Sequence, residues 1–291
     1  MQSLPLVISF VVAAGVVAPV SRSLVELGLT QKNYRGTPVA FPAGIAIVIA
    51  AFLALVPLSL LQELADADVF RPGLETALIY VVGVSMLGLL DDLIGSGVLT
   101  RGEAAGGTRQ PLPRGWRGHA RAIAGGRLST GALKAAGSLG LALFVLRDGG
   151  RTKPEYFLAV ALVVLTTNLF NLLDLRPGRS AKALVLLGAL LTLASMDVNP
   201  LWALGLFVGP ILAVLPLDLR ERAMLGDTGS NAIGAVAGLW LVLTLSTTAQ
   251  AIALGVVLLI TVYGEFRSIS ALIDRTPGLR HLDSLGRISH A

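Results

Sequence analysis

The 291-residue sequence has no cysteine and few charged residues. Without cysteine the chain can form no disulfide, no thiolate metal site and no cysteine nucleophile. Asp, Glu, Lys and Arg make up 14% of the residues, whereas a typical soluble domain has about 25%. So little charge would not keep the surface of a chain this size in solution, which excludes an ordinary soluble globular protein. The three histidines lie outside the apolar runs, so a His-rich metal centre has little support.

Hydrophobic residues make up 54% of the sequence and come in long runs. A bilayer core needs roughly 20 mostly apolar helical residues, with about 17 as a lower limit. We therefore predict an all-α polytopic membrane protein, a single integral membrane domain over 1–291 with about nine transmembrane helices. The first run has no basic segment before it and no small-residue cleavage site, so we expect a retained helix. The predicted runs are 4–20, 39–62, 74–92, 128–146, 155–173, 181–196, 200–217, 231–245 and 250–265.

Basic residues are distributed unevenly between the two sets of connections. One set comprises the predicted loops 21–38, 93–127, 174–180 and 218–230 and the tail 266–291. The opposite set holds only Arg71, Arg147, Arg151 and Lys153, and the remaining 19 of the 23 basic residues belong to or adjoin the first set. Cytoplasmic loops collect Lys and Arg. The bias therefore predicts an external N-terminus and a cytoplasmic C-terminus.

Polar residues fall at the predicted cytoplasmic ends of three runs. Acidic groups at such depths are costly and usually functional. Carboxylate and amide oxygens suit Mg²⁺, which takes one or two carboxylates plus water and substrate phosphates. Each cluster alone also fits a helix end, an interhelical hydrogen bond or a turn with an N-cap, but three at one depth favour a shared site. The clusters are Asp91 with Asp92; Asn168 with Asn171 and Asp174; and Asp227 in Gly226-Asp-Thr-Gly-Ser230, where Thr228 or Ser230 could cap the next helix.

In this order, these motifs resemble those of the polyprenyl-phosphate N-acetylhexosamine-1-phosphate transferases. That family of integral membrane enzymes (glycosyltransferase family 4) includes the bacterial phospho-MurNAc-pentapeptide translocase. The resemblance runs from Asn33 to about Ser270. It rests on a basic loop (Asn33-Tyr-Arg-Gly-Thr-Pro-Val39), an aspartate pair (Asp91-Asp92), an NxxNxxD motif (Asn168 to Asp174) and a GDxGS motif (Gly226 to Ser230).

The resemblance implies a reaction and its partners. A sugar-1-phosphate would pass from a UDP-sugar to a polyprenyl phosphate such as undecaprenyl phosphate, with release of UMP. The reaction would use Mg²⁺ at the cytoplasmic face of the bacterial cytoplasmic (inner) membrane, in the synthesis of cell-envelope polymers such as peptidoglycan. The resemblance leaves a homodimer open. We also expect membrane lipid as a partner, and no nucleic acid.

The same resemblance assigns roles to individual residues. The catalytic residues would be Asp91, Asp92 and Asp174, and the metal ligands Asp227 and Asp91. Because an ionised phosphate is already a nucleophile, Asp91 could act electrostatically rather than as a base. The substrate-binding residues would be Asn168, Asn171, Lys134, Arg35, Thr37, Gly226, Arg176 and Arg179.

Three features depart from the family pattern. Pro177 replaces the aspartate that usually follows NxxNxxD, the last cytoplasmic segment offers only His281 in place of a His cluster, and nine runs replace ten. These departures leave open an alternative, a catalytically idle relative that binds or moves a polyprenyl-linked lipid or scaffolds envelope assembly. An ion-coupled transporter is disfavoured, because its carboxylates would lie near the midplane rather than at helix ends.

Overall fold

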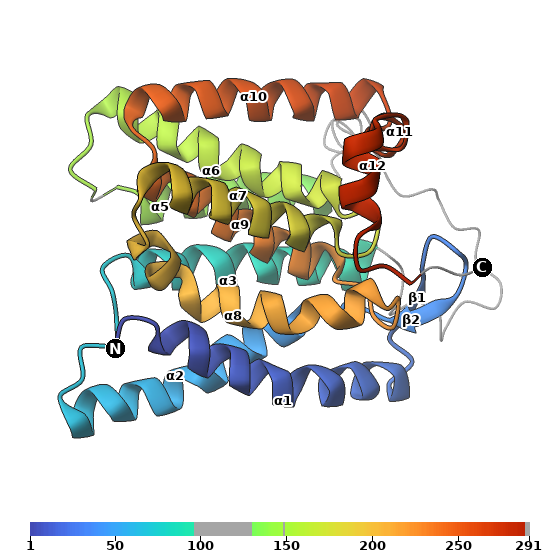
Figure 1. Cartoon of the computed structure of the whole chain (residues 1–291), viewed down its shortest axis with the longest axis horizontal. Coiled ribbons are helices and arrows are strands. Elements are labelled where there is room, and N and C mark those ends of the chain that lie inside the picture. Colours follow the sequence, from blue (N-terminus) through green and yellow to red (C-terminus); the bar gives the residue numbers. More distant parts are fainter. Residues whose placement is uncertain (96–129, 148, 289–291) are drawn as a thin grey trace.

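Each predicted apolar run overlaps a helix, and the helix of the run 39–62 begins only at Ile45. The computed structural model of the chain describes residues 1–95, 130–147 and 149–288, so most of the predicted loop 93–127 lies outside the described residues. Figure 1 shows the long helices running side by side in one bundle. They are α1 (Leu4–Glu26), α2 (Ile45–Ala65), α3 (Leu74–Leu90), α5 (Thr130–Val145), α6 (Lys153–Leu173), α7 (Arg179–Ser195), α8 (Asn199–Leu219), α9 (Gly226–Thr244) and α10 (Thr247–Phe266).

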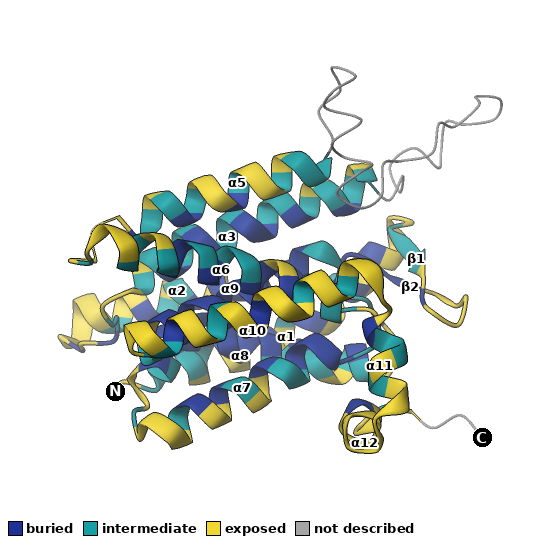
Figure 2. Ribbon diagram, turned by 90° about the horizontal axis from the view of Figure 1, so that it is seen from above, coloured by how far each residue is buried: buried dark blue, intermediate teal, exposed yellow. Residues whose placement is uncertain are grey.

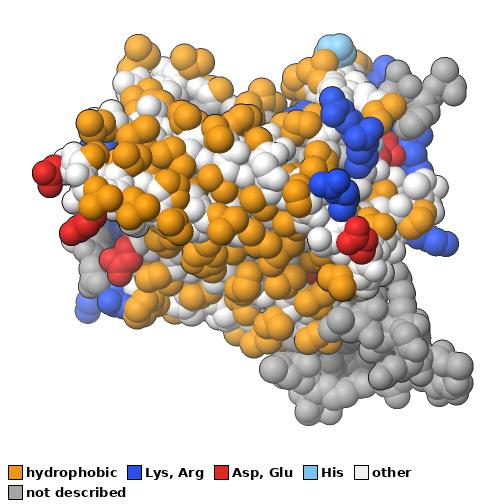
Figure 3. Space-filling model, turned by 90° about the horizontal axis from the view of Figure 1, so that it is seen from below, with side chains coloured by type: hydrophobic (Ala, Val, Ile, Leu, Met, Phe, Trp, Pro, Cys, Tyr) orange, Lys and Arg blue, Asp and Glu red, His pale blue; other side chains and the backbone are white. Residues whose placement is uncertain are grey.

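The bundle has the dimensions and surface of a membrane-spanning protein. Within the described residues, six helices are long and apolar enough to cross a bilayer: α1, α2, α3 with its extension, α6, α8 and α10. Hydrophobic side chains cover the middle of the molecule, while Lys, Arg, Asp and Glu gather towards its ends (Figure 3). This distribution matches a bilayer core between two polar interfaces. The fold class is therefore an all-α membrane protein.

Helix α9 forms the centre of the bundle. It packs against α3, α6, α7 and α8, and the residues from Thr228 to Val242 are all buried. A Cβ atom added at Gly234 would lie 2.7 Å from the Cα atom of Thr167, and one at Gly238 would lie 3.0 Å from the Cα atom of Val163. These two glycines therefore let the backbones of α9 and α6 approach closely, as small residues do in membrane helix pairs.

The outer helices differ strongly in exposure. Helices α1, α2 and α8 pack together, and the Ser9 hydroxyl of α1 donates to the carbonyl of Gly205 in α8 at 3.1 Å. Helix α10 lies along the outside of the bundle and is exposed along most of its length (Figure 2). In this helix the buried residues are Gln250 and Val257.

Several predicted loops contain regular structure. Helix α1 continues to Glu26, because polar residues end the hydropathy run before they end the helical hydrogen bonds. The remainder of 21–38 forms an antiparallel hairpin of β1 (Thr30–Lys32) and β2 (Pro38–Ala40), with Thr30 opposite Ala40. Helix α3 continues as a short π-helix, η1 (Asp91–Gly95).

The C-terminal segment also differs from the predicted polar tail. It folds into two short helices, α11 (Ile269–Arg275) and α12 (Pro277–Ser284). Both helices lie at the same end of the bundle as the β-hairpin, opposite the N-terminus (Figure 1). The hairpin is joined to the α8–α9 connection, where the amide of Met224 donates to the carbonyl of Ala40 at 2.9 Å. This end of the molecule therefore gathers elements from across the sequence.

Candidate active site

Asp92 holds the start of α9. Its carboxylate accepts hydrogen bonds from the backbone amides of Asp227 and Thr228, both at 2.8 Å, and from the Thr228 hydroxyl at 2.6 Å. The first amides of a helix have no partner within the helix, so a buried carboxylate from η1 takes the place of the cap that the sequence predicted at Thr228 or Ser230. No side chain of α9 caps its own N-terminus.

Gly226 makes this close approach feasible. Its backbone φ is +70°, a conformation that glycine adopts without the steric cost that a Cβ atom imposes. A Cβ atom here would also lie 2.6 Å from Oδ2 of Asp92. The predicted substrate-binding residue Gly226 thus lies directly against the predicted catalytic residue Asp92.

A second cluster surrounds the ammonium group of Lys134. Its Nζ atom lies 2.5 Å from Oδ2 of Asp227 and 3.9 Å from Oδ2 of Asp91. The side-chain amide of Asn171 lies against the same groups; in the orientation that satisfies its neighbours, its oxygen accepts from Nζ of Lys134 and its nitrogen donates to Oδ1 of Asp227 at 3.1 Å and to the Ser230 hydroxyl at 3.3 Å. Four elements, η1, α5, α6 and α9, therefore bring together residues from Asp91 to Ser230.

This cluster is partly exposed, and its carboxylate and amide oxygens are of the kind that Mg²⁺ takes as ligands. The side chains of Lys134, Asp91 and Asp227 keep 16%, 23% and 29% of their surface exposed. Within the described residues, no three His, Cys, Asp or Glu side chains converge as metal ligands. Mg²⁺ needs only one or two carboxylates, because water and substrate phosphates complete its shell. The two carboxylates that now surround the Lys134 ammonium, with the amide oxygen of Asn171 beside them, would fit that requirement.

Asp174 follows the last residue of α6 and lines a small cavity of about 40 Å³, together with Asn33, Tyr34, Arg176 and Asp218. Burial, and next the carboxylates of Asp218 and Asp227, raise the pKa of Asp174 well above its ordinary value. Asp174 thus lies at the same end of the bundle as the Lys134 cluster, and the Asp227 carboxylate of that cluster is among its electrostatic neighbours. Asn168, two turns earlier in α6, is exposed.

The β-hairpin places Arg35 and Thr37 beside this small cavity. The Asn33 side-chain oxygen accepts from the backbone amides of both residues, at 2.9 and 3.0 Å. The Arg35 guanidinium donates to Glu221 at 3.0 Å. Two guanidiniums contact the Tyr34 ring, that of Arg35 at 5.0 Å and that of Arg176 at 4.6 Å from its centroid. Two predicted substrate-binding arginines therefore contact one exposed aromatic ring.

Arg179 has a different environment from the other predicted substrate-binding residues. Its buried guanidinium makes two 2.9 Å hydrogen bonds to the Asp283 carboxylate and one of 2.9 Å to the Ser270 hydroxyl. Arg287 also donates to Asp283, at 2.6 Å, and Lys182 donates to three carbonyls at and just after the end of α12. Arg179 thus fixes the C-terminal helices to α7, and His281 is exposed on the outside of α12.

Sequence reasoning missed Glu221, Asp218 and Asp283. Asp218 lies near the end of α8, is 5% exposed and accepts from the Gly178 amide at 2.7 Å. The sequence signal for Asp218 was a carboxylate at the end of an apolar run, because such a group is costly without a partner. Glu221 and Asp283 lie in polar segments, where an acidic residue has no such signal.

Comparison of the chain with protein-family models and with curated proteins finds no match. The structure presents a partly exposed group of carboxylates, one ammonium and one amide at a bundle end, with two arginines and an aromatic ring at the same end. Such a group can bind a divalent cation and a phosphorylated ligand.

Proposed function

We propose that this chain transfers a sugar-1-phosphate from a UDP-sugar to a polyprenyl phosphate and releases UMP. The carrying observation is the convergence of Asp91, Asn171 and Asp227 around Lys134. The first three belong to motifs that resemble those of the polyprenyl-phosphate transferases in the same order. Their gathering at one bundle end supports the reading of these motifs as parts of one site.

The proposed reaction is a displacement at phosphorus. An oxygen of the polyprenyl phosphate attacks the phosphorus that bears the sugar, and a new P–O bond forms. The bond from that phosphorus to the bridging oxygen breaks, and UMP leaves with the electron pair. Phosphoryl transfer depends mainly on positioning and charge neutralisation, so the attacking phosphate needs no strong base.

The residues divide this work between them. Mg²⁺ held by Asp227 and Asp91 would neutralise the diphosphate and the departing UMP. Lys134 would move from these carboxylates to a substrate phosphate once the metal is bound. Asp92 positions Asp227 through the two backbone amides it holds.

The nucleotide end of the site is built differently from the family pattern. Pro177 has no hydrogen-bonding side chain, and Arg179 is held by Asp283. We therefore assign donor contacts to Tyr34 and Arg176, which line the small cavity with Asp174, and to Arg35, which contacts the Tyr34 ring. An aromatic ring with two guanidiniums offers a stacking face and a positive charge to a nucleotide sugar.

The site faces the cytoplasm in the proposed topology. Nine crossings with an external N-terminus put this bundle end on the cytoplasmic side of a bacterial cytoplasmic membrane. The excess of basic residues in the same set of connections supports this orientation. UDP-sugars are made in the cytoplasm, so the site would meet its donor there.

The test is UMP release by the purified full-length protein with undecaprenyl phosphate, Mg²⁺ and a panel of UDP-sugars. Asp227→Asn removes a charged ligand, and we expect Mg²⁺-dependent UMP release to fall by at least about 100-fold, as losses of positioned charge in active sites do. Asp274→Asn, an exposed aspartate on α11, is the matched control and should keep wild-type activity. Full activity of Asp227→Asn would refute the assignment.

A catalytically idle relative remains the second candidate function. The observations that favour it are the Lys134–Asp227 ion pair, which neutralises the metal ligand without a metal, and Pro177 at the nucleotide end. This candidate predicts binding of polyprenyl phosphate without UMP release from any donor. The same assay, run with a lipid-binding measurement, separates the two functions.

A further inference from the structure

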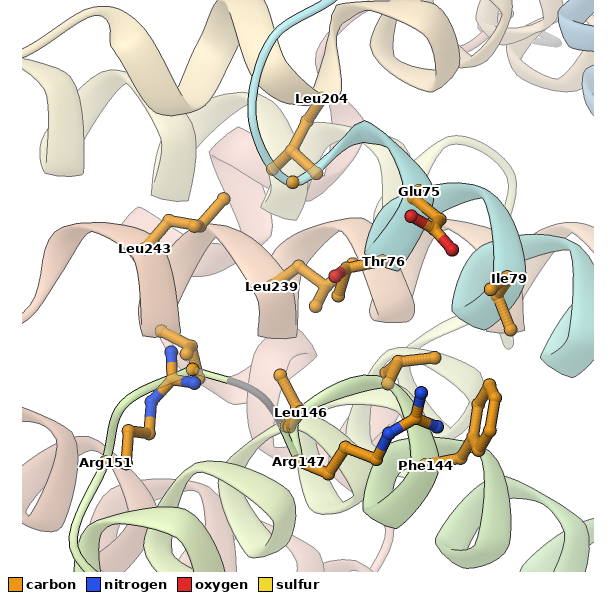
Figure 4. Close-up of a pocket in the computed structure, with 14 residues that line it drawn as sticks. Glu75, Thr76, Ile79, Phe144, Leu146, Arg147, Arg151, Leu204, Leu239 and Leu243 are labelled. Atoms are coloured by element: carbon orange, nitrogen blue, oxygen red, sulfur yellow. The ribbon is translucent and has the colours of Figure 1, made fainter.

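Two cavities lie at opposite ends of the bundle. The larger one, of about 330 Å³, is lined by residues of α3, α5, α8 and α9 (Figure 4). Helix α3 separates Glu75 in this cavity from Asp91 in the carboxylate cluster by roughly 24 Å, at 1.5 Å per residue. The larger cavity therefore lies outside the proposed transfer site. The small cavity beside Asp174 lies at the end of the cluster, and one of its walls is the α6–α7 connection, residues 174–178.

One peptide group of the α6–α7 connection is held from two directions. The carbonyl of Pro177 accepts a hydrogen bond from Nε of Arg287 at 2.9 Å. The amide of Gly178, which belongs to the same peptide group, donates to Oδ2 of Asp218 at 2.7 Å. A peptide group is planar, and its C=O and N–H point in opposite directions when it is trans. The two bonds therefore fix the orientation of this group between α8 and the segment that follows α12.

Arg287 is itself held in place. Its Nη2 atom donates to Oδ1 of Asp283 at 2.6 Å, and Arg179 of α7 binds both oxygens of the same carboxylate. The side chain of Arg287 keeps only 14% of its surface exposed. Hydrogen bonds of charged donors are stronger than those of neutral ones. The C-terminal segment therefore presents a fixed guanidinium to the Pro177 carbonyl.

The fixed peptide group restricts the position of Arg176. Proline locks its own φ and narrows the conformations of the residue before it, so Arg176 and Pro177 form a stiff pair. The Arg176 guanidinium lies 4.6 Å from the centroid of the Tyr34 ring, and both residues line the small cavity. A bond to the Pro177 carbonyl therefore acts on a guanidinium at the edge of that cavity.

We propose that Arg287 is a positioning residue of the donor site, which holds the α6–α7 connection so that the Arg176 guanidinium stays over the Tyr34 ring. This inference rests on the proposed function and deepens it, because it gives the C-terminal segment a part in binding the nucleotide sugar. Pro177, which departs from the family pattern, contributes its backbone carbonyl in place of a side chain. Arg287 acts through Pro177 and Arg176 and touches no reacting atom.

The first test is hydrogen exchange of the ligand-free full-length protein in detergent. Arg287→Gln removes the guanidinium, and we expect peptides covering 174–182 to exchange at least about tenfold faster, as the loss of a charged hydrogen bond allows. Peptides from α9 should keep their wild-type rates, which distinguishes a local release from general unfolding. Arg280→Gln, at an exposed arginine of α12, is the matched control and should leave both regions unchanged. Wild-type exchange of 174–182 in Arg287→Gln would overturn the proposal.

The second test separates donor binding from the transfer step. Arg287→Gln should raise KM for the UDP-sugar at least about tenfold and leave kcat and KM for polyprenyl phosphate little changed. Asp174 keeps its place, because its amide is held by the carbonyl of Asn171 in α6. A purely structural defect would lower kcat and would not select one substrate. Arg287→Lys, which retains a charged donor, should recover part of the lost donor affinity.

The two tests fail in distinguishable ways. An unchanged donor KM in Arg287→Gln, with 174–182 exchanging faster, would overturn the role of Arg287 in donor binding. If the wild type released no UMP with any UDP-sugar, the proposed transfer would fail. The exchange measurement, which uses no substrate, would still decide whether Arg287 holds the α6–α7 connection.

Discussion

Two adjacent aspartates have different partners at the end of α3. The Asp92 carboxylate receives the backbone amides of Asp227 and Thr228, whereas that of Asp91 faces Lys134. Successive residues of a helix point about 100° apart, so one side chain enters the bundle and the other stays at its open end. The pair thus separates into a residue that positions a loop and a residue that a ligand can reach.

We predict that Asp92→Asn destabilises the protein by about 1–3 kcal/mol, the range for an unsatisfied buried polar group. An amide nitrogen would face backbone N–H donors that now have an acceptor. Thr228→Val removes the hydroxyl bond alone and should cost less, about 0.5–1.5 kcal/mol. Unfolding in detergent, followed by circular dichroism against denaturant, measures both changes.

Asp274→Asn again provides the control, because this exposed aspartate is outside the cluster. If Asp92→Asn were as stable as Asp274→Asn, the capping role of Asp92 would be wrong. A loss of UMP release without any loss of stability would instead assign Asp92 directly to the reaction.

At the residue scale the sequence indicated the members of the site better than their partners. Asp91, Asn171 and Asp227 could be singled out because polar groups at the ends of apolar runs are costly. Arg179 could not be assigned in the same way. Its partner Asp283 lies 104 residues later in a polar segment, and no spacing rule connects them.

Among the elements, the helices were predictable and their ends were not. A run of about 20 apolar residues predicts a helix, because only hydrogen-bonded backbone is tolerated in lipid. The start of α9 at Gly226 was missed, since it depends on a carboxylate from η1. Helices α11 and α12 were missed as well, because 7 and 8 residues carry too short a pattern.

The attachment of α12 should depend on pH. Burial raises the pKa of Asp283, but the hydrogen bonds from Arg179 and Arg287 outweigh it and hold that pKa below its ordinary value. Because the folded-state pKa is depressed, the stabilisation is present above the unfolded value, about 3.9. It is lost as the pH falls through the folded-state pKa. We expect α12 to detach from α7 in that acidic range while the helical bundle persists.

Hydrogen exchange of peptides from α12, followed from pH 6 to pH 2 and corrected for the intrinsic pH dependence of exchange, measures this detachment. Asp283→Asn should show weak protection of α12 at every pH, because the charge that titrates is gone. Asp274→Asn should keep the wild-type profile. Protection of α12 that stays constant over this range in the wild type would contradict the electrostatic attachment.

At the scale of the whole molecule, the two ends of the bundle carry different chemistry. One end holds the carboxylate cluster, the β-hairpin and the C-terminal helices, and the other holds a cavity with two arginines and a glutamate. Helix α9 connects both, because it begins at the cluster and its C-terminal part lines the cavity. The sequence could not predict this arrangement. Charge bias and span counting assign residues to a membrane face, but they do not show which residues line the same cavity.

The absence of cysteine makes the orientation of the two ends directly measurable. In the proposed topology the α2–α3 connection is external and α11 is cytoplasmic, so a single cysteine at the exposed position of Asp68 or of Asp274 should be accessible from one side only. A membrane-impermeant maleimide should label Asp68→Cys in sealed spheroplasts and Asp274→Cys only after lysis. The cysteine-free wild type is the control for background labelling.

The reverse pattern would invert the orientation and place the carboxylate cluster outside, where it meets no UDP-sugar. Labelling of both positions before lysis would mean an even number of crossings between them, whereas the proposed topology requires seven of its nine helices to cross in that interval.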